Sequence, residues 1–77
     1  MSFTTDSIEE LNLLLRYPET SMEGLKIHHD ADAQIVAAAQ NLFDKGLTTQ
    51  KDGGYLTDLG RSAFECAMSL QNLIAAN

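Results

Sequence analysis

Apolar residues recur every three or four positions in three separate stretches of this chain, and such spacing is typical of amphipathic helices. The stretches cover about 6–16, 31–45 and 58–75. Between the first two stretches, the run 25–28 alternates apolar and polar residues, which predicts a short β-strand. The chain is therefore predicted to be mostly helical, with a minor β component.

Each predicted helix has one apolar face that we expect to point into a core. On the first helix this face is formed by Ile8, Leu11, Leu14 and Leu15. On the second helix it is formed by Ile35, Val36, Ala39, Leu42 and Phe43. On the third helix it is formed by Leu59, Ala63, Cys66, Ala67, Leu70, Leu73 and Ile74.

The third helix has more apolar surface than one small core needs. Phe64 and Met68 lie one turn apart, beside the predicted inward face. A helix that is apolar over most of its circumference is usually buried on more than one side. We therefore expect a homodimer whose interface contains Phe64, Met68, Gln71 and Ala75.

The segment between the last two helices is predicted to form a tight β-hairpin. The run 52–54, Asp-Gly-Gly, tolerates the positive φ of a two-residue turn centred on 52–53 or 53–54. In either register Leu47 and Leu56 share one face, which we expect to pack inward. The opposite face is polar apart from one ring, and we expect it to contact solvent or a ligand. It carries Thr48, Gln50, Tyr55 and Thr57.

Residues that favour helix ends flank these elements. Gly46 accepts the left-handed conformation that closes a helix, and Thr57 has a hydroxyl that can cap the next one. Asp6 or Ser7 is expected to cap the first helix, and Asp30 the second. A wing is built in this order, helix, hairpin and helix. The pattern therefore predicts a winged-helix-like α+β domain with three main helices, a short strand and a two-stranded wing.

The length and the cysteine content point to one small intracellular domain. A chain of 77 residues is expected to form a single domain over 1–77, burying only about 60–65% of its extended surface. Cys66 is the only cysteine, and we expect its thiol to be buried and inert. No segment resembles a signal peptide or is long enough to cross a bilayer. We therefore expect a cytoplasmic protein that gains buried surface by pairing.

The charge of the chain argues against nucleic-acid binding. The formal net charge is −6 and the pI is about 4.5, whereas phosphate contacts require clustered Lys and Arg. Three of the five basic residues, Lys45, Lys51 and Arg61, lie around the hairpin in the sequence. A small basic patch at the wing is therefore expected, diluted by neighbouring aspartates.

The sequence carries no recognisable catalytic or metal-binding pattern. His28 and His29 are adjacent on a predicted strand, so they point to opposite faces and do not chelate together; we expect one inside and one outside. Zinc sites need two ligand pairs at defined spacing, and no such spacing is present. Nucleophile motifs and glycine-rich phosphate loops are also missing from the sequence. We expect no metal, no cofactor and no enzymatic activity.

Two runs of residues resemble known proteins. The run 45–47, Lys-Gly-Leu, followed by 52–60 is similar to the wing of many winged-helix regulators, which show a Leu-Thr-x-x-Gly helix start. Through the run 24–31 and the hairpin, nearly the whole chain resembles a family of small uncharacterised bacterial proteins with a winged-helix-like fold. Some members of that family carry a DNA-binding label.

The resemblance implies a way of binding double-stranded DNA. The helix before the wing would be the recognition helix, with Gln34 and Asn41 reading adenine edges. Phosphate contacts would come from Lys45, Thr49, Gln50, Lys51 and Arg61. Asp30 and Asp32 depart from this pattern, because two carboxylates at the start of that helix repel phosphate.

Two functions follow from these observations. The first is a small DNA-binding transcription regulator of winged-helix type. The second is a non-enzymatic protein-interaction module, a homodimerising adaptor whose acidic surface avoids DNA.

Overall fold

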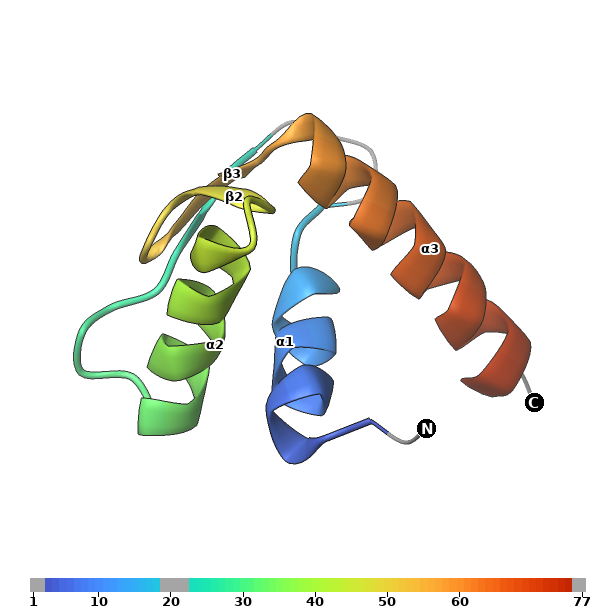
Figure 1. The fold of residues 1–77 in the computed structure, drawn as a ribbon, viewed down its shortest axis with the longest axis horizontal. Helices are drawn as coiled ribbons and strands as arrows, with labels where there is room; N and C mark the ends of the chain where they lie inside the picture. The colour runs from blue at the N-terminus through green and yellow to red at the C-terminus, as the bar shows by residue number, and fades with distance from the viewer. Residues whose placement is uncertain (1–2, 19–22, 76–77) are drawn as a thin grey trace.

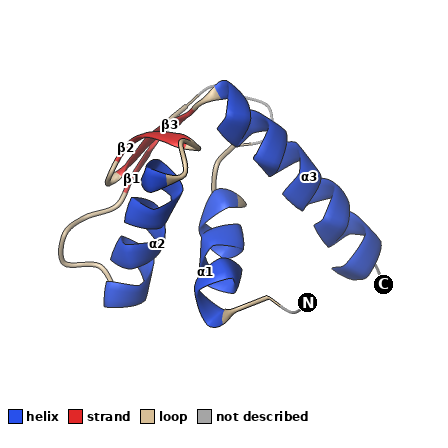
Figure 2. Cartoon of the chain, viewed as in Figure 1, coloured by secondary structure: helices blue, strands red, loops and turns tan. Residues whose placement is uncertain are grey.

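The computed structural model describes residues 3–18 and 23–75, which form three helices and one three-stranded sheet. In chain order the elements are α1 (Thr5–Leu14), β1 (Leu25–Lys26), α2 (Ala33–Asp44), β2 (Thr48–Gln50), β3 (Gly53–Leu56) and α3 (Asp58–Ala75). The sheet is antiparallel with the order β1-β3-β2. Helices α1 and α2 lie side by side below the sheet, and α3 slopes away from them toward the C-terminus (Figures 1 and 2).

The predicted α+β, mostly helical layout is confirmed, and it is compatible with a winged helix. Strand β1 precedes α2, and the hairpin β2–β3 lies between α2 and α3. A helix-turn-helix places two helices in succession. Here a single helix lies between β1 and β2, and residues 27–32 connect β1 to it without forming a helix. The two-stranded hairpin of a wing is therefore present, whereas the segment between β1 and β2 contains one helix instead of the two of a helix-turn-helix.

The core consists of two clusters that meet at α1. The first cluster joins α1 to β1 and α2 through Leu13, Ile27, Ala38, Ala39 and Leu42. The second joins the end of α1 to α3 through Leu14, Tyr17, Phe64 and Ala67. Consecutive leucines on α1 thus serve different clusters, which places α1 between the other two helices.

The predicted inward face of α1 is partly wrong. Ile8 is 46% exposed, whereas Leu13 is buried in the first cluster. Because α1 packs against α2 on one side and α3 on another, its buried arc is shifted from the single stripe that apolar spacing gives. Tyr17 is also buried, and the desolvation of its phenol, followed by the negative charge of Asp52, raises its pKa above 10.0.

The helix ends differ in detail from the expected ones. Thr4, not Asp6 or Ser7, is the N-cap of α1, and its Oγ1 accepts a hydrogen bond of 3.1 Å from the Ser7 backbone N–H. Asp32, not Asp30, occupies the N-cap position of α2, without a side-chain capping bond. The caps lie within two residues of the expected positions because several polar residues stand near each helix start.

The C-terminus of α2 forms as the sequence predicts. Gly46 has a φ of +80°, its N–H donates to the Phe43 carbonyl at 2.9 Å, and the Leu47 N–H donates to the Leu42 carbonyl at 3.0 Å. These two bonds make a Schellman motif, and Leu47 packs against the cluster that contains Leu42. The motif fixes the direction in which the chain enters the wing.

The wing has the expected two-residue turn, but not at the expected residues. Gln50 pairs with Gly53, so Lys51 and Asp52 are the central residues, and the register shifts between Gln50 and Thr48, which pairs with Leu56. Gly53 and Gly54 have positive φ values of 117° and 72° within β3. A Cβ at Gly53 would lie 2.3 Å from the Leu25 carbonyl oxygen of β1. The glycines therefore allow strands to approach β3 closely rather than making the turn.

The inward face of the hairpin is confirmed, and its outer face is partly wrong. Leu47 packs against the first cluster and Leu56 against the second. Thr48, predicted to be on the solvent face, is buried, and its hydroxyl donates to the Gln50 carbonyl at 3.2 Å. The register shift interrupts the alternation that the prediction assumes, because three steps along β3, from 53 to 56, lie opposite two along β2, from 48 to 50.

The start of α3 is fixed to the turn that follows α2. The Thr57 hydroxyl caps α3 by accepting from the Gly60 N–H at 3.0 Å, and it donates to the Gly46 carbonyl at 2.6 Å. A Cβ at Gly60 would lie 1.9 Å from the Leu47 carbonyl oxygen. The Leu-Thr-x-x-Gly start is thus explained by a cap and a close backbone approach, which together orient α3.

Candidate protein-interaction surface on helix α3

Helix α3 has two apolar faces. One is packed in the core, and the other is mostly exposed, although its Ala63 packs partly buried against the second cluster. Phe64 and Ala67 are buried against α1, and Met68 packs partly buried beside them. This core face contains part of the surface that the sequence assigned to a dimer. Among the residues proposed for that interface, Phe64 lies inside the core, whereas Gln71 and Ala75 are exposed at the edge of a hollow next to α1.

The other face of α3 is an exposed apolar stripe. We call the residues Leu59, Ala63, Cys66, Leu70 and Leu73 the outer stripe. Leu59 is 59% exposed, Leu70 40% and Leu73 83%, and the neighbouring Ile74 is 73% exposed. The expectation that this face points inward is therefore wrong for the large residues. We call the close approach of Gly60 to the Leu47 backbone the clamp at Gly60. In the orientation of α3 that this contact fixes, Phe64 rather than Leu59 or Leu70 is buried against α1.

Cys66 lies on the outer stripe. Its thiol is free and exposed, so the expectation of a buried cysteine is wrong. The reason is again the orientation of α3, because Cys66 shares a face with Leu59 and Leu70 and not with Phe64.

The C-terminal half of α3 carries no charge. From Cys66 to the end of the sequence there is no Asp, Glu, Lys, Arg or His, although 21% of the chain is charged. Exposed helices normally carry charged residues on the side that faces water. A charge-free helix with exposed Leu and Ile instead has the composition of a surface that is covered by a partner.

An apolar groove runs beside the outer stripe, between α1 and α3. Its volume is about 320 Å³, and its walls include Phe3 and Leu11 from the N-terminal part and Ala63, Cys66 and Leu70 from α3. Phe3 is 64% exposed at this groove. The small side chains at 63 and 66 leave the groove open, so it can receive large apolar side chains from outside.

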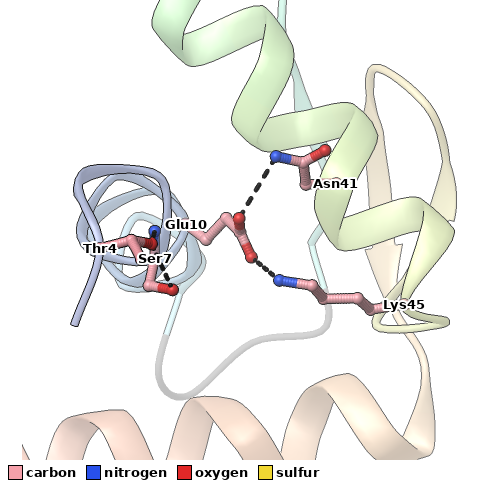
Figure 3. A network of polar contacts seen from close by, with 5 residues as sticks. All are labelled: Thr4, Ser7, Glu10, Asn41 and Lys45. Atoms are coloured by element: carbon pink, nitrogen blue, oxygen red, sulfur yellow. Dashed lines mark hydrogen bonds and ion pairs between the residues drawn. The ribbon is translucent and has the colours of Figure 1, made fainter. Parts of the chain in front are cut away.

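A polar network crosses from α1 to α2 at the edge of this groove. Figure 3 shows Glu10 of α1 extending between Asn41 and Lys45 of α2, with the Thr4–Ser7 cap on the other side of the α1 ribbon. The Asn41 amide donates to Glu10 Oε2 at 3.3 Å, and the Lys45 ammonium forms an ion pair with Glu10 Oε1. Glu10 is only 7% exposed, so the cation and the amide stabilise a buried carboxylate.

This network involves two of the residues assigned to DNA recognition. Asn41 and Lys45 point toward α1 and contact Glu10, and Ala38 on the same face is buried. Gln34 lies nearby, in a hollow that it shares with Asp6 and Glu9 of α1. The face of α2 that a base-reading helix would present to DNA is therefore packed against α1 and bordered by carboxylates.

The family of unknown function DUF5669 matches residues 1–75. The chain belongs to the DUF5669 family. No curated protein and no solved structure matches it.

The wing of this DUF5669 chain forms a second, more polar hollow. A cleft of about 470 Å³ lies between α2, the segment after β1 and the wing turn, and it is bordered by Lys26, His28, His29 and Lys51. Both histidines are exposed, so the expectation of one buried histidine is wrong. The Lys26 ammonium lies 2.7 Å from Asp52 Oδ2, and this bond holds the pKa of Asp52 below 3.8.

The basic residues of the wing region do not form one patch. Lys45 contacts Glu10, Arg61 lies over the Phe64 ring at 5.5 Å, and Lys51 borders the cleft. Thr49 and Gln50 are exposed on β2, and Thr49 Oγ1 accepts from the Tyr55 N–H at 2.9 Å. The expected convergence of cations is thus limited to Lys26 and Lys51, which share the cleft.

Two further findings concern metal-binding side chains and membrane-spanning helices among the described residues. Within 3–18 and 23–75, no three His, Cys, Asp or Glu side chains gather closely enough to bind a metal ion. None of the helices in these same ranges has the length and apolarity that crossing a bilayer requires. Among the described residues, the outer stripe contains three of the exposed large hydrophobic side chains, Leu59, Leu70 and Leu73.

Proposed function

We propose that this DUF5669 chain is a non-enzymatic protein-interaction module that forms a homodimer through the outer stripe of α3. One observation carries the proposal: Leu59, Leu70 and Leu73 are exposed along a helix whose last turns contain no charged residue. Large exposed apolar surfaces on soluble domains mark interaction sites. The groove between α1 and α3 widens this surface beyond a single row of side chains.

A second copy of the chain is the partner that the charge favours. Each copy has a net charge of −6, so most surfaces of two copies repel each other. The outer stripe consists only of uncharged residues, and two such stripes can meet without placing carboxylates together. A two-fold pair also uses the same patch on both copies, so one outer stripe from each copy is enough to form the interface.

Burial of the exposed apolar residues is the main favourable contribution to pairing. Full burial of a Leu or Ile side chain contributes about 1.5–3 kcal/mol. Leu59, Leu70, Leu73 and Ile74 are 40–83% exposed in a single copy, so each contributes part of this value against an association cost of about 4–15 kcal/mol. A domain of 77 residues also has few other means of adding buried surface.

Sedimentation velocity across a concentration series tests the proposal. The wild-type chain is expected to approach twice its mass of 8.4 kDa in the micromolar range. Leu73→Lys introduces a charge into the stripe and is expected to weaken the pairing at least about tenfold, equivalent to 1.4 kcal/mol. Asn72→Lys adds the same charge at an exposed position away from the stripe and serves as the matched control. A wild-type monomer at every concentration would disprove the proposal.

The free, exposed thiol of Cys66 supports a cytoplasmic location in this proposal. A free, accessible cysteine at an apolar interface forms unwanted disulfides in an oxidising compartment, whereas a reducing cytoplasm keeps it as a thiol.

DNA binding is the second candidate function, and the wing supports it. The winged-helix-compatible layout and the cleft shared by Lys26 and Lys51 provide a cationic edge that could contact phosphates. It ranks second because α1 covers the reading face of α2 and because the chain is acidic. A salt titration of binding to random duplex DNA tests it, with Lys51→Glu expected to lower the affinity and reduce the salt slope by about one. Absence of binding at low salt would exclude it.

A further inference from the structure

We infer that two copies pair their α3 helices antiparallel, with Cys66 of one copy opposite Leu70 of the other and Ala63 opposite Leu73. The inference rests on the proposed homodimer and adds its direction and register. It starts from the spacing of the outer stripe, whose members at 59, 63, 66, 70 and 73 are separated by four, three, four and three residues. This is the a/d spacing of a coiled-coil seam.

The sizes of the side chains select the register. In an antiparallel pair, a positions face d positions of the second helix. With 66 opposite 70 and 63 opposite 73, each layer combines one small and one large residue, which fills space evenly. Shifting the helices so that Leu59 faces Leu70 instead places Ala63 opposite Cys66 and leaves a small–small layer. The first register therefore packs better.

The direction follows from the same residues. A parallel pair would place Ala63 against Ala63 and Cys66 against Cys66, and these layers would be thin next to layers of two leucines. The antiparallel pair also sets the N-terminus of one α3 beside the C-terminal half of the other, which is favourable for the helix dipoles. Packing and electrostatics thus agree on the antiparallel arrangement.

The groove beside the stripe lies where this register needs space. Phe3 and Leu11 border it next to Ala63 and Cys66, the two small members of the seam. In the antiparallel register, Leu70 and Leu73 of the second copy lie over these small residues and enter the groove of about 320 Å³. The exposed Phe3 then covers their outer side. The small residues thus form part of the wall of the groove that these two leucines enter.

The positions that flank the seam contain no like charges. Ser62 and Ser69 precede the a positions, and Ala67 and Ile74 follow the d positions. Charged residues at these positions normally set the choice of partner in coiled coils. Here two chains of net charge −6 meet along seam and flanking positions of α3 that carry no carboxylate, and Glu10 at the groove is paired with Lys45.

Disulfide trapping in a mixture of two chains tests the register. The first chain is wild type, with its single cysteine at 66. The second is the double variant Cys66→Ser/Leu70→Cys, so its only thiol lies at 70. Oxidation is expected to join the two chains, because opposite positions of one layer bring Cα atoms within the roughly 4.4–6.8 Å that a disulfide needs. The control chain, Cys66→Ser/Asn72→Cys, carries its thiol off the seam and is expected not to cross-link.

The wild-type chain alone distinguishes the direction of pairing. In the antiparallel register the two Cys66 residues are offset by four residues along the helix axis, about 6 Å, in addition to their lateral separation. Wild-type chains are then expected to cross-link poorly. Efficient Cys66–Cys66 cross-linking, absent from the mixture with the Leu70→Cys chain, would mean a parallel pair and would overturn the inference.

A second pair of chains keeps the test independent of Leu70. Mixing Cys66→Ser/Ala63→Cys with Cys66→Ser/Leu73→Cys is expected to give the same covalent heterodimer. Sedimentation of each mixture before oxidation separates the two levels of failure. Dimers that cross-link at neither pair would overturn the register and leave the proposed function standing. Monomers throughout would overturn both.

Discussion

The two apolar faces of α3 are similar in composition and opposite in environment. On the core face Phe64 is 2% exposed, whereas on the outer stripe Leu73 is 83% exposed. The difference arises at the start of the helix, where Thr57 and Gly60 fix α3 against the turn after α2. Apolar periodicity predicts that α3 has apolar faces suited to burial. The contacts of Thr57 and Gly60 at its N-terminus fix which of these faces packs against α1.

Truncating one residue from each face should separate their roles. Phe64→Ala is expected to lower the free energy of unfolding by about 3–5 kcal/mol, because it removes a ring from a packed core. Leu73→Ala is expected to change it by less than about 0.5 kcal/mol, since the side chain is exposed in the single copy. Urea denaturation below the dimerisation concentration measures both. A loss for Leu73→Ala as large as that for Phe64→Ala would contradict the assignment of faces.

The clamp that orients α3 can be broken at Gly60. A Cβ there would lie 1.9 Å from the Leu47 carbonyl oxygen, which forces the helix away from the turn. Gly60→Ala is therefore expected to destabilise the fold by more than about 2 kcal/mol, although alanine favours helices. Thermal unfolding measures the effect, with the exposed Ser62→Ala as a control that should stay within about 0.5 kcal/mol. Equal stability of the two variants would show that the contact is not needed.

The network between α1 and α2 shapes the wall of the groove next to the outer stripe. Glu10→Gln and Lys45→Gln each remove one member of the ion pair, and a double-mutant cycle isolates their interaction. We expect a coupling of roughly 1 kcal/mol, because the carboxylate is buried while the ammonium is largely exposed. Chemical denaturation of the four proteins gives the value. Additive effects of the two substitutions would contradict the proposed role of the pair.

The ion pair at the wing should affect neither face of α3. Lys26 lowers the pKa of Asp52, so the pair stabilises the fold above the unfolded pKa of Asp52, and this contribution disappears as the pH falls through the lowered folded value. In Lys26→Met, we expect the pKa of Asp52, measured by an NMR titration, to rise toward 3.8. The acid-dependent part of the stability should become smaller, and dimerisation should be unchanged. An Asp52 titration that stays the same would contradict the assigned cause.

Elements that depend on neighbouring residues could be predicted from the sequence. The Schellman end at Gly46, the cap at Thr57 and the inward pair Leu47 and Leu56 all form as expected. Each depends on hydrogen bonds or alternation within a few residues, so local sequence is sufficient. The predicted position of the wing turn is wrong because Gly53 and Gly54 have their positive φ values within β3, where β1 and β2 approach closely on both sides.

Features that depend on tertiary packing could not be predicted in the same way. Leu59, Leu70 and Phe64 are all suitable core residues, and the sequence does not say that a backbone contact at Gly60 chooses Phe64. Likewise, Asn41 and Lys45 look like outward polar residues until α1 places Glu10 between them. The sequence contains one indication that α3 is unusual, because the stretch from Cys66 onward has no charged residue on any side of the helix. It coincides with the part of α3 on which Leu70, Leu73 and Ile74 are exposed.

The alkylation rate of Cys66, measured against protein concentration, tests the central claim most directly. The thiol is exposed on the outer stripe of a single copy and lies in the seam of the proposed pair. The account predicts fast reaction with iodoacetamide in dilute solution and slowing as the concentration passes through the dimerisation range, with Leu73→Lys reacting fast throughout. A wild-type rate that is independent of concentration would contradict the account.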